Sequence, residues 1–130
     1  MADPSYPEEL LYHAEHDWAR VEDGEATLGI TWHAQDLLGE VVFIEPPAVG
    51  TQIKQHQPYT EVESVKAVSD VIAPLSGEVL EVNQRVVDAP EIVNEDPYGE
   101  GWLVRIRLAE VAEVDGLLDV AGYRQVLAEQ

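Results

Sequence analysis

The chain has 130 residues, and its 26 acidic side chains against 7 lysines and arginines give a formal net charge of −19. Its length fits one domain, and its 45% hydrophobic residues are enough for a packed core. So few basic residues exclude nucleic acid and anionic membrane surfaces as partners. The lack of cysteine excludes disulfides, thiolate metal sites and cysteine nucleophiles, and no apolar run reaches the ~20 residues that span a bilayer.

The first ten residues are polar and contain two prolines, which predicts a flexible N-terminal arm over residues 1–10. We expect residues 11–130 to form a single domain. The start of the chain has neither the basic-then-apolar order of a signal peptide nor the arginine- and serine-rich composition of a transit peptide. The sequence therefore predicts a cytoplasmic protein.

Short β-branched and aromatic runs separated by turn residues predict a mostly β fold. Residues 22–24 (Glu-Asp-Gly) mark a tight turn between the first two of these runs. Pro46 and Pro47 end the third run, because proline cannot donate to a strand ladder. The predicted strands occupy residues 18–21, 26–30, 41–44, 60–65, 71–73 and 102–108.

Two helices are predicted. Thr31 can cap a short helix through Leu38, because its side-chain oxygen can accept early helical N–H groups, and Gly39 ends this helix. Residues of about 117–128 form an apolar stripe at mixed three- and four-residue spacing, which predicts a C-terminal helix. This helix either packs on the sheet as a lid or docks a partner.

Two segments with similar residues indicate an internal duplication. Gly77-Glu78-Val79-Leu80 resembles Gly39-Glu40-Val41-Val42, and a tyrosine, Tyr59 or Tyr98, lies at a similar distance from each segment. Two similar β-motifs packed as one unit favour a sandwich or a barrel. Coincidence between two common Gly-Glu-Val triplets is the alternative.

No set of residues in the sequence supports catalysis. His13 and His16 have the spacing of metal ligands, but no second ligand cluster follows them, which favours surface histidines beside a strand. Glu61 and Glu63 are close together, yet 26 carboxylates produce such pairs by chance. The sequence therefore predicts a protein that is not an enzyme.

One segment, Glu63-Ser64-Val65-Lys66-Ala67, contains one of only two lysines among acids and valines. An ordinary solvated lysine that pairs with nearby carboxylates is the simpler interpretation, and it suits Lys54 well. The β-branched neighbours and Pro74 favour strands over a helix, so Lys66 is expected between two strands. Neither Asn-Gly nor Asp-Gly marks the turn, so periodicity alone supports this hairpin weakly.

Several motifs follow one another in order over residues 12–127. The main stretches are His16-Asp17-Trp18, Gly29-Ile30-Thr31, Leu38-Gly39-Glu40-Val41-Val42-Phe43, Glu63-Ser64-Val65-Lys66-Ala67, Ser76-Gly77-Glu78-Val79 and Asn94-Glu95-Asp96-Pro97-Tyr98. With these motifs the chain resembles the H proteins of the glycine cleavage system, a family of lipoyl carriers. The ordered series at family-like spacing is far more specific than any single tetrapeptide.

The resemblance implies a flattened β-barrel or sandwich of two quasi-symmetric halves, with a short internal helix and a C-terminal helix. It also implies that Lys66 lies at the tip of a hairpin, where an amide bond joins its amine to lipoic acid. A lipoate ligase or an octanoyl or lipoyl transferase would attach this group within the motif formed by Glu63, Ser64, Val65 and Ala67.

The same resemblance implies three partner enzymes. These are a glycine decarboxylase (P protein), an aminomethyltransferase (T protein) and a dihydrolipoamide dehydrogenase (L protein), between which the arm shuttles an aminomethyl group. Because that group carries a cationic amine, we hypothesise that Asp17 and Asp70 hold it in a cleft. The alternative is that both are solvated carboxylates. The family usually has glutamate at the position of Asp17.

Other carriers are the main alternatives. Biotinyl carriers flank their lysine with methionines, whereas Val65 and Ala67 flank Lys66. Lipoyl domains of acyltransferases are shorter, place aspartate before the lysine and lack the C-terminal helix. A further alternative is an H-like protein that relays lipoyl groups to other enzymes. The sequence alone does not distinguish such a relay protein from the glycine cleavage carrier.

Overall fold

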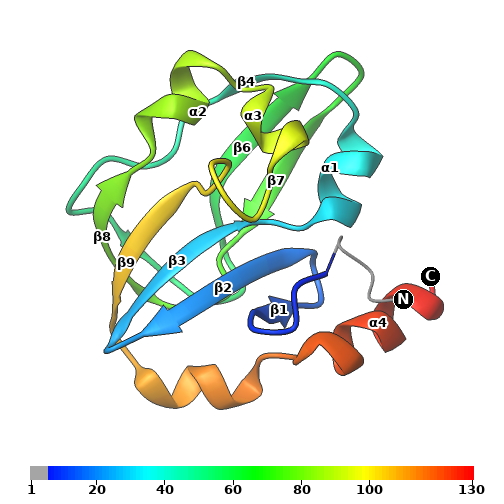
Figure 1. Ribbon diagram of the computed structural model, residues 1–130. Helices are drawn as coiled ribbons and strands as arrows, with labels where there is room; N and C mark the ends of the chain where they lie inside the picture. Colours follow the sequence, from blue (N-terminus) through cyan, green and yellow to red (C-terminus); the bar gives the residue numbers. More distant parts are fainter. Residues whose placement is uncertain (1–5) are drawn as a thin grey trace.

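A computed structural model describes residues 6–130, in which the strands form a six-stranded and a three-stranded antiparallel sheet. The strand order is β1-β2-β3-β9-β8-β5 in the larger sheet and β4-β6-β7 in the smaller one (Figure 1). The strands are β1 (Leu11–His13), β2 (Asp17–Glu22), β3 (Glu25–Ile30), β4 (Val41–Ile44), β5 (Gln52–Ile53), β6 (Pro58–Ser64), β7 (Val68–Ile72), β8 (Gly77–Val82) and β9 (Val104–Leu108).

The helices are short and lie between or after the strands. The 3₁₀ helix η1 and α4 follow the last strand along the lower edge of Figure 1. None of the helices in residues 6–130 is long and apolar enough to cross a membrane. The helices are α1 (Trp32–Leu38), α2 (Gln84–Asp88), α3 (Ile92–Glu95), η1 (Val111–Gly116) and α4 (Val120–Ala128).

The predicted mostly β fold is confirmed as a flattened sandwich. Of the two forms that the sequence left open, the described residues adopt two separate sheets and not a closed barrel. The physical reason is that β5 and β7 each end a sheet and pair on one side only. The β2–β3 hairpin turns at Asp23 and Gly24, whose positive φ angles of 49° and 79° suit the tight turn predicted there.

Helix α1 forms where the capping residues predict it. The Thr31 hydroxyl oxygen accepts the N–H of Ala34 at 3.2 Å, which satisfies one of the free donors of the first turn. The helix ends at Gly39, whose φ of 76° lies in the region that glycine adopts without strain. Strand β4 follows almost at once, so α1 is held close to the smaller sheet.

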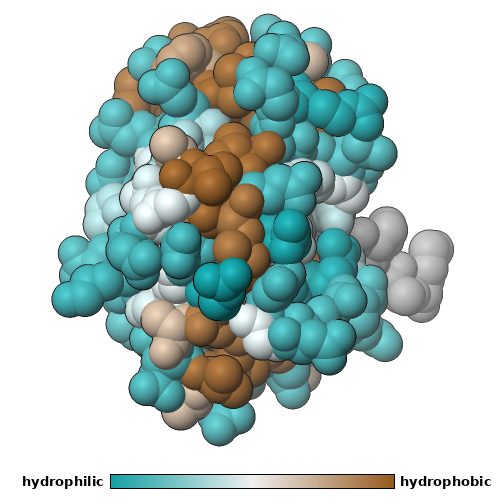
Figure 2. Space-filling view, turned by 90° about the vertical axis from the view of Figure 1, so that its left-hand side faces the viewer, coloured by the Kyte–Doolittle hydropathy of each residue, from teal (hydrophilic) through white to brown (hydrophobic). Residues whose placement is uncertain are grey.

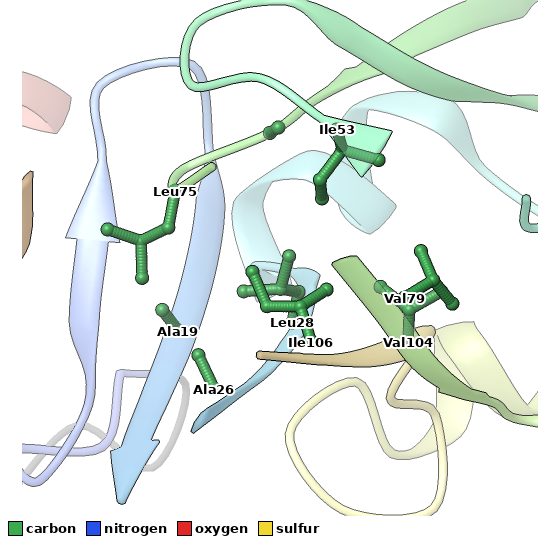
Figure 3. Close-up of a cluster of buried hydrophobic side chains, with 9 residues drawn as sticks. Ala19, Ala26, Leu28, Ile53, Leu75, Val79, Val104 and Ile106 are labelled. Atoms are coloured by element: carbon green, nitrogen blue, oxygen red, sulfur yellow. The ribbon is translucent and has the colours of Figure 1, made fainter. Parts of the chain in front are cut away.

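Two groups of buried aliphatic side chains form most of the core. In the first, side chains of β2, β3, β8 and β9 point toward one another and toward Ile53 and Leu75 (Figure 3). The second joins the smaller sheet to the short helices and includes Val62 of β6 and Val71 of β7. Each fully buried valine contributes about 1.5–3 kcal/mol, so the base of the β6–β7 hairpin is firmly anchored.

A third, largely aromatic group fixes the C-terminal helix to the body. Tyr123 of α4 stacks on Tyr12 of β1 with ring centroids 4.7 Å apart, and Trp18 is buried beside them. The first half of the predicted N-terminal arm lies outside the described residues. In its second half Tyr6 and Leu10 are buried against this group, because aromatic surface is available there.

One face of the molecule is mostly hydrophilic, as the charge predicts (Figure 2). Figure 2 views the side of the molecule on which β8 and α2 lie, and hydrophobic residues form a narrow band there between hydrophilic ones. Helices α1 and α4 lie on the opposite side in Figure 1, so the band is separate from the site described next.

Candidate functional site

Lys66 lies at the exposed tip of the hairpin formed by β6 and β7, as predicted from the sequence. Ser64 shapes the turn: its N–H donates to the carbonyl oxygen of Ala67 at 2.8 Å. The Ser64 hydroxyl oxygen accepts the N–H groups of Ala67 and Lys66 at 3.1 and 3.3 Å. Ser64 therefore closes the turn with its side chain, and residues 64–67 adopt none of the positive φ angles that favour Asn-Gly, which explains why the hairpin signal in the sequence is weak.

The hairpin tip rests on the turn between α1 and β4. The N–H of Val65 donates to the carbonyl oxygen of Glu40 at 3.0 Å. The stem of Lys66 passes over Gly39, where a Cβ atom would lie 3.5 Å from the Cε atom of the lysine. The tip is thus held against the body of the protein while the amine stays accessible.

A cleft of about 320 Å³ opens beside the tip, between α1, β7 and residues 15–17. Its walls include the apolar side chains of Leu37, Val68 and Val71. The two carboxylates singled out in the sequence, Asp17 and Asp70, both line it although they come from different sheets. The fold therefore brings together two predicted residues that are far apart in the sequence.

The two carboxylates differ sharply in environment. Asp70 is exposed, whereas Asp17 is only 2% exposed, and its Oδ2 atom has no hydrogen-bond partner among residues 6–130. Burial raises the pKa of Asp17 well above 3.8, and the nearby charge of Glu15 adds to this rise. An ionised Asp17 is thus costly for the free protein, and a cation in the cleft would relieve that cost.

Asp17 is expected to make stability depend on pH. Its pKa is higher in the folded than in the unfolded chain, so the stability that its protonated form gives is lost as the pH rises through the raised pKa. At neutral pH, Asp17→Asn should therefore raise the free energy of unfolding by about 1–3 kcal/mol, because burying a neutral amide costs less than burying an ionised carboxylate. Urea unfolding over a series of pH values measures this difference.

The control for this prediction is Asp36→Asn, which removes an exposed carboxylate from α1 and should change stability by less than about 0.5 kcal/mol. The gain from Asp17→Asn should shrink as the pH falls. A gain that grows toward acid pH would contradict the assigned direction of the pKa shift.

The sequence analysis missed His16 as a residue of the cleft. His16 has a φ of 75° and lines the cleft, and its Nδ1 lies 2.8 Å from the Tyr123 hydroxyl, which is 2.8 Å from the Thr31 hydroxyl. His13 is buried and contacts His56 through ring nitrogens 2.8 Å apart, so it is not a surface histidine. Within residues 6–130 no three side chains form a cluster that could hold a metal ion.

The network at His16 links the C-terminal helix to the cleft. Tyr123 of α4 contacts the residue that caps α1, and α1 forms one wall of the cleft. The only sequence signal for this role was the position of His16 beside Asp17 and Trp18 in the first matched motif. Its side-chain partner Tyr123 is 107 residues away, so spacing could not reveal the contact.

This geometry is that of a carrier domain, because it presents one amine at the end of a braced hairpin and offers a cleft for what that amine bears. A profile of the Glycine cleavage H-protein family matches residues 10–130. A curated Glycine cleavage system H protein of Halorhodospira halophila is 54% identical over 125 residues, covering 95% of this chain and 96% of the relative.

Two further comparisons agree. The Glycine cleavage system H protein of Symbiobacterium thermophilum is 52% identical over 117 residues, covering 90% of this chain and 91% of the relative. The crystal structure of a glycine cleavage system H protein from Mycobacterium marinum superposes with a TM-score of 0.87 at 38% identity, covering 94% and 98% of the two chains. The chain belongs to the glycine cleavage H-protein family. This confirms the resemblance seen in the sequence and the lipoyl-carrier role that it implies.

Proposed function

We propose that Lys66 carries a lipoyl group and presents it to the enzymes of the glycine cleavage system. The family works with glycine decarboxylase, aminomethyltransferase and dihydrolipoamide dehydrogenase, and its members carry the lipoyl group on a lysine. The observation that supports Lys66 is its place at the exposed hairpin tip, directly beside the cleft. Lys54, the other lysine, follows β5 and precedes the base of the hairpin.

The residues around Lys66 fit a lipoyl arm. When attached, the lipoyl group would supply a redox-active disulfide, and its sulfur atoms would carry the one-carbon amine. The apolar walls of the cleft suit an aliphatic chain, and the unpartnered Oδ2 of Asp17 suits a cationic amine. The chain's own part is to hold, orient and shelter the arm, and we propose that it catalyses no reaction itself.

The motif residues have distinct places at the tip. Ser64 closes the turn, and Val65 joins it to the α1–β4 turn through its N–H. Ala67 lines the cleft, and Glu63 pairs with Val68 at the start of the tip. Val65 and Val68 are 66% and 61% exposed, which offers apolar contacts to a lipoate ligase or an octanoyl or lipoyl transferase.

We propose that Asp17 and Asp70 retain the amine of the charged arm in the cleft. A hydrogen bond to a charged group contributes about 1.5–3 kcal/mol, so Asp17→Asn should make the charged carrier lose its amine at least about tenfold faster. Asp70 is exposed, so Asp70→Asn should have a smaller effect. Intact-mass spectrometry over time measures the loss, and NMR shifts of Ser69 on charging report occupancy of the cleft.

Asp36→Asn is the matched control for this experiment, since Asp36 lies on α1 but lines a different hollow. Its lifetime should equal that of the unchanged protein. If both cleft variants also keep an unchanged lifetime, neither carboxylate retains the amine and the proposed role is wrong.

Reconstitution tests the proposed function as a whole. The lipoylated chain, mixed with purified glycine decarboxylase, should support exchange of labelled bicarbonate into glycine, whereas each protein alone should not. Transfer of the lipoyl group to other enzymes without such exchange would instead indicate a relay protein. Covalent biotin on the native protein would indicate a biotinyl carrier.

We also propose that residues 11–130 act as a single carrier domain, which the packing of α4 on β1 through Tyr123 supports. We place its activity in the cytoplasm, together with the NAD-dependent dehydrogenase that reoxidises the arm. Limited proteolysis should leave residues 11–130 uncut, and fractionation should find the protein with its partner enzymes.

A further inference from the structure

Asn94 of α3 connects the second half of the chain to the turn that supports Lys66. Its Oδ1 accepts the N–H of Val41 at 2.8 Å. Its Nδ2 donates to the carbonyl oxygen of Gly39 at 2.8 Å and to Oε1 of Gln35 at 3.0 Å. The carboxamide thus pairs with the backbone on both sides of Glu40, as a neighbouring strand would, and both kinds of polar atom are used.

Glu40 in turn holds the hairpin tip. The backbone atoms that flank it are fixed by Asn94, and its own carbonyl oxygen accepts the N–H of Val65, the residue before Lys66. The stem of Lys66 lies over Gly39, whose carbonyl oxygen accepts a hydrogen bond from the side chain of Asn94. A continuous path of hydrogen bonds therefore runs from α3 to the residue next to the modified lysine.

The β4–β6 ladder joins the hairpin to β4 as far as the pair of Val41 and Ser64, and beyond this pair the tip rests on Glu40. The hydrogen bonds of Ser64 fix the shape of the turn, but they lie within the hairpin and do not place it against α1. Gly39 has no side chain to restrain the supporting turn, and its φ of 76° leaves few other residues able to stand there. The side chain of Asn94 supplies the restraint that the sequence of the turn lacks.

We propose that Asn94 is a positioning residue for lipoylation: it fixes the α1–β4 turn and, through Glu40, the place of Val65 and Lys66. The inference rests on the proposed attachment of the lipoyl group to Lys66. A modifying enzyme that recognises one placement of the tip binds only the fraction of molecules that adopt it. Loss of the brace lowers this fraction, which raises the KM for the carrier and leaves kcat nearly unchanged.

Asn83 offers a matched control, because it is a buried asparagine at the start of the neighbouring helix α2. It also makes three side-chain hydrogen bonds, donating to the carbonyl oxygens of Glu100 and Trp102 and accepting the N–H of Arg85. None of these partners lies at the α1–β4 turn. Asn83→Ala therefore costs stability in the same way without removing the brace.

The experiment compares Asn94→Ala with Asn83→Ala in two measurements on the full chain. The first is the kinetics of lipoylation with purified lipoate ligase, lipoate and ATP. If the competent fraction falls to about a tenth, Asn94→Ala raises KM about tenfold, whereas Asn83→Ala changes it less than about twofold. The second is amide hydrogen exchange of Val65, which should accelerate on the order of tenfold in Asn94→Ala only.

Asn94→Asp provides a second variant of nearly unchanged volume. Its carboxylate can still accept the N–H of Val41, but it meets the carbonyl oxygen of Gly39 without a proton to donate. It should therefore behave like Asn94→Ala in both measurements, even if the alanine variant folds poorly.

Any one of three results would overturn the positioning role of Asn94. These are equal changes of KM in the Asn94 and Asn83 variants, a loss confined to kcat, or unchanged amide hydrogen exchange at Val65. The exchange measurement needs no lipoyl group. A chain that is not lipoylated at Lys66 would therefore refute the proposed function, while the exchange result would still decide whether Asn94 braces the tip.

Discussion

Replacement of Lys66 by arginine is expected to abolish both lipoylation and the glycine–bicarbonate exchange that depends on it. Arginine keeps the positive charge and much of the length, but its guanidinium stays protonated and cannot serve as the amine that the modifying enzyme acylates. Intact mass after incubation with lipoate ligase, followed by the exchange assay, measures the effect. Both signals should fall to the background seen without the carrier.

Lys54→Arg is the control, since it changes the only other lysine and lies outside the hairpin. It should keep full lipoylation and exchange. Because Lys66 is exposed, neither variant should change the free energy of unfolding by more than about 0.5 kcal/mol. Exchange that survives in Lys66→Arg and disappears in Lys54→Arg would reassign the attachment site.

The largest effect on stability is expected at Gly77, the first residue of β8. A Cβ atom there would overlap the carbonyl oxygen of Arg107 and lie 3.0 Å from Cδ1 of Ile106. Arg107 belongs to β9, and residues 77 and 78 pair with this strand, so the clash cannot be relieved without disturbing the ladder. Gly77→Ala should therefore lower the free energy of unfolding by about 3 kcal/mol or more.

Gly116→Ala is the matched control, because nothing lies within 4 Å of its Cβ position and its φ is not in the left-handed region. Urea unfolding of both variants gives the comparison. The control should stay within about 0.5 kcal/mol of the unchanged protein. An equally small loss in Gly77→Ala would mean that β8 and β9 pair less closely than in the structure.

Local signals in the sequence predict the parts of the fold that local chemistry determines. Thr31 and Gly39 bound α1 because a capping hydroxyl and a residue with positive φ act within one helical turn. The turn at Asp23 and Gly24 follows for the same reason. The hairpin around Lys66 is signalled more weakly, because Ser64 closes it with a side chain and not with a standard turn dipeptide.

The cleft could be predicted only in part, because tertiary packing assembles it. The motifs identify Asp17 and Asp70, but nothing local indicates that one would be buried and the other exposed. His16 and Asn94 stand in matched motifs without a role, since their partners Tyr123 and Gly39 are far away in the sequence. Such long-range hydrogen bonds leave no periodic pattern along the chain.

Peptide mass spectrometry of the protein, produced in cells supplied with lipoate, tests the assignment of the attachment site most directly. The account predicts a lipoyl amide on the peptide that contains Lys66 and an unmodified peptide that contains Lys54. A lipoyl group on Lys54, or biotin on Lys66, would contradict it.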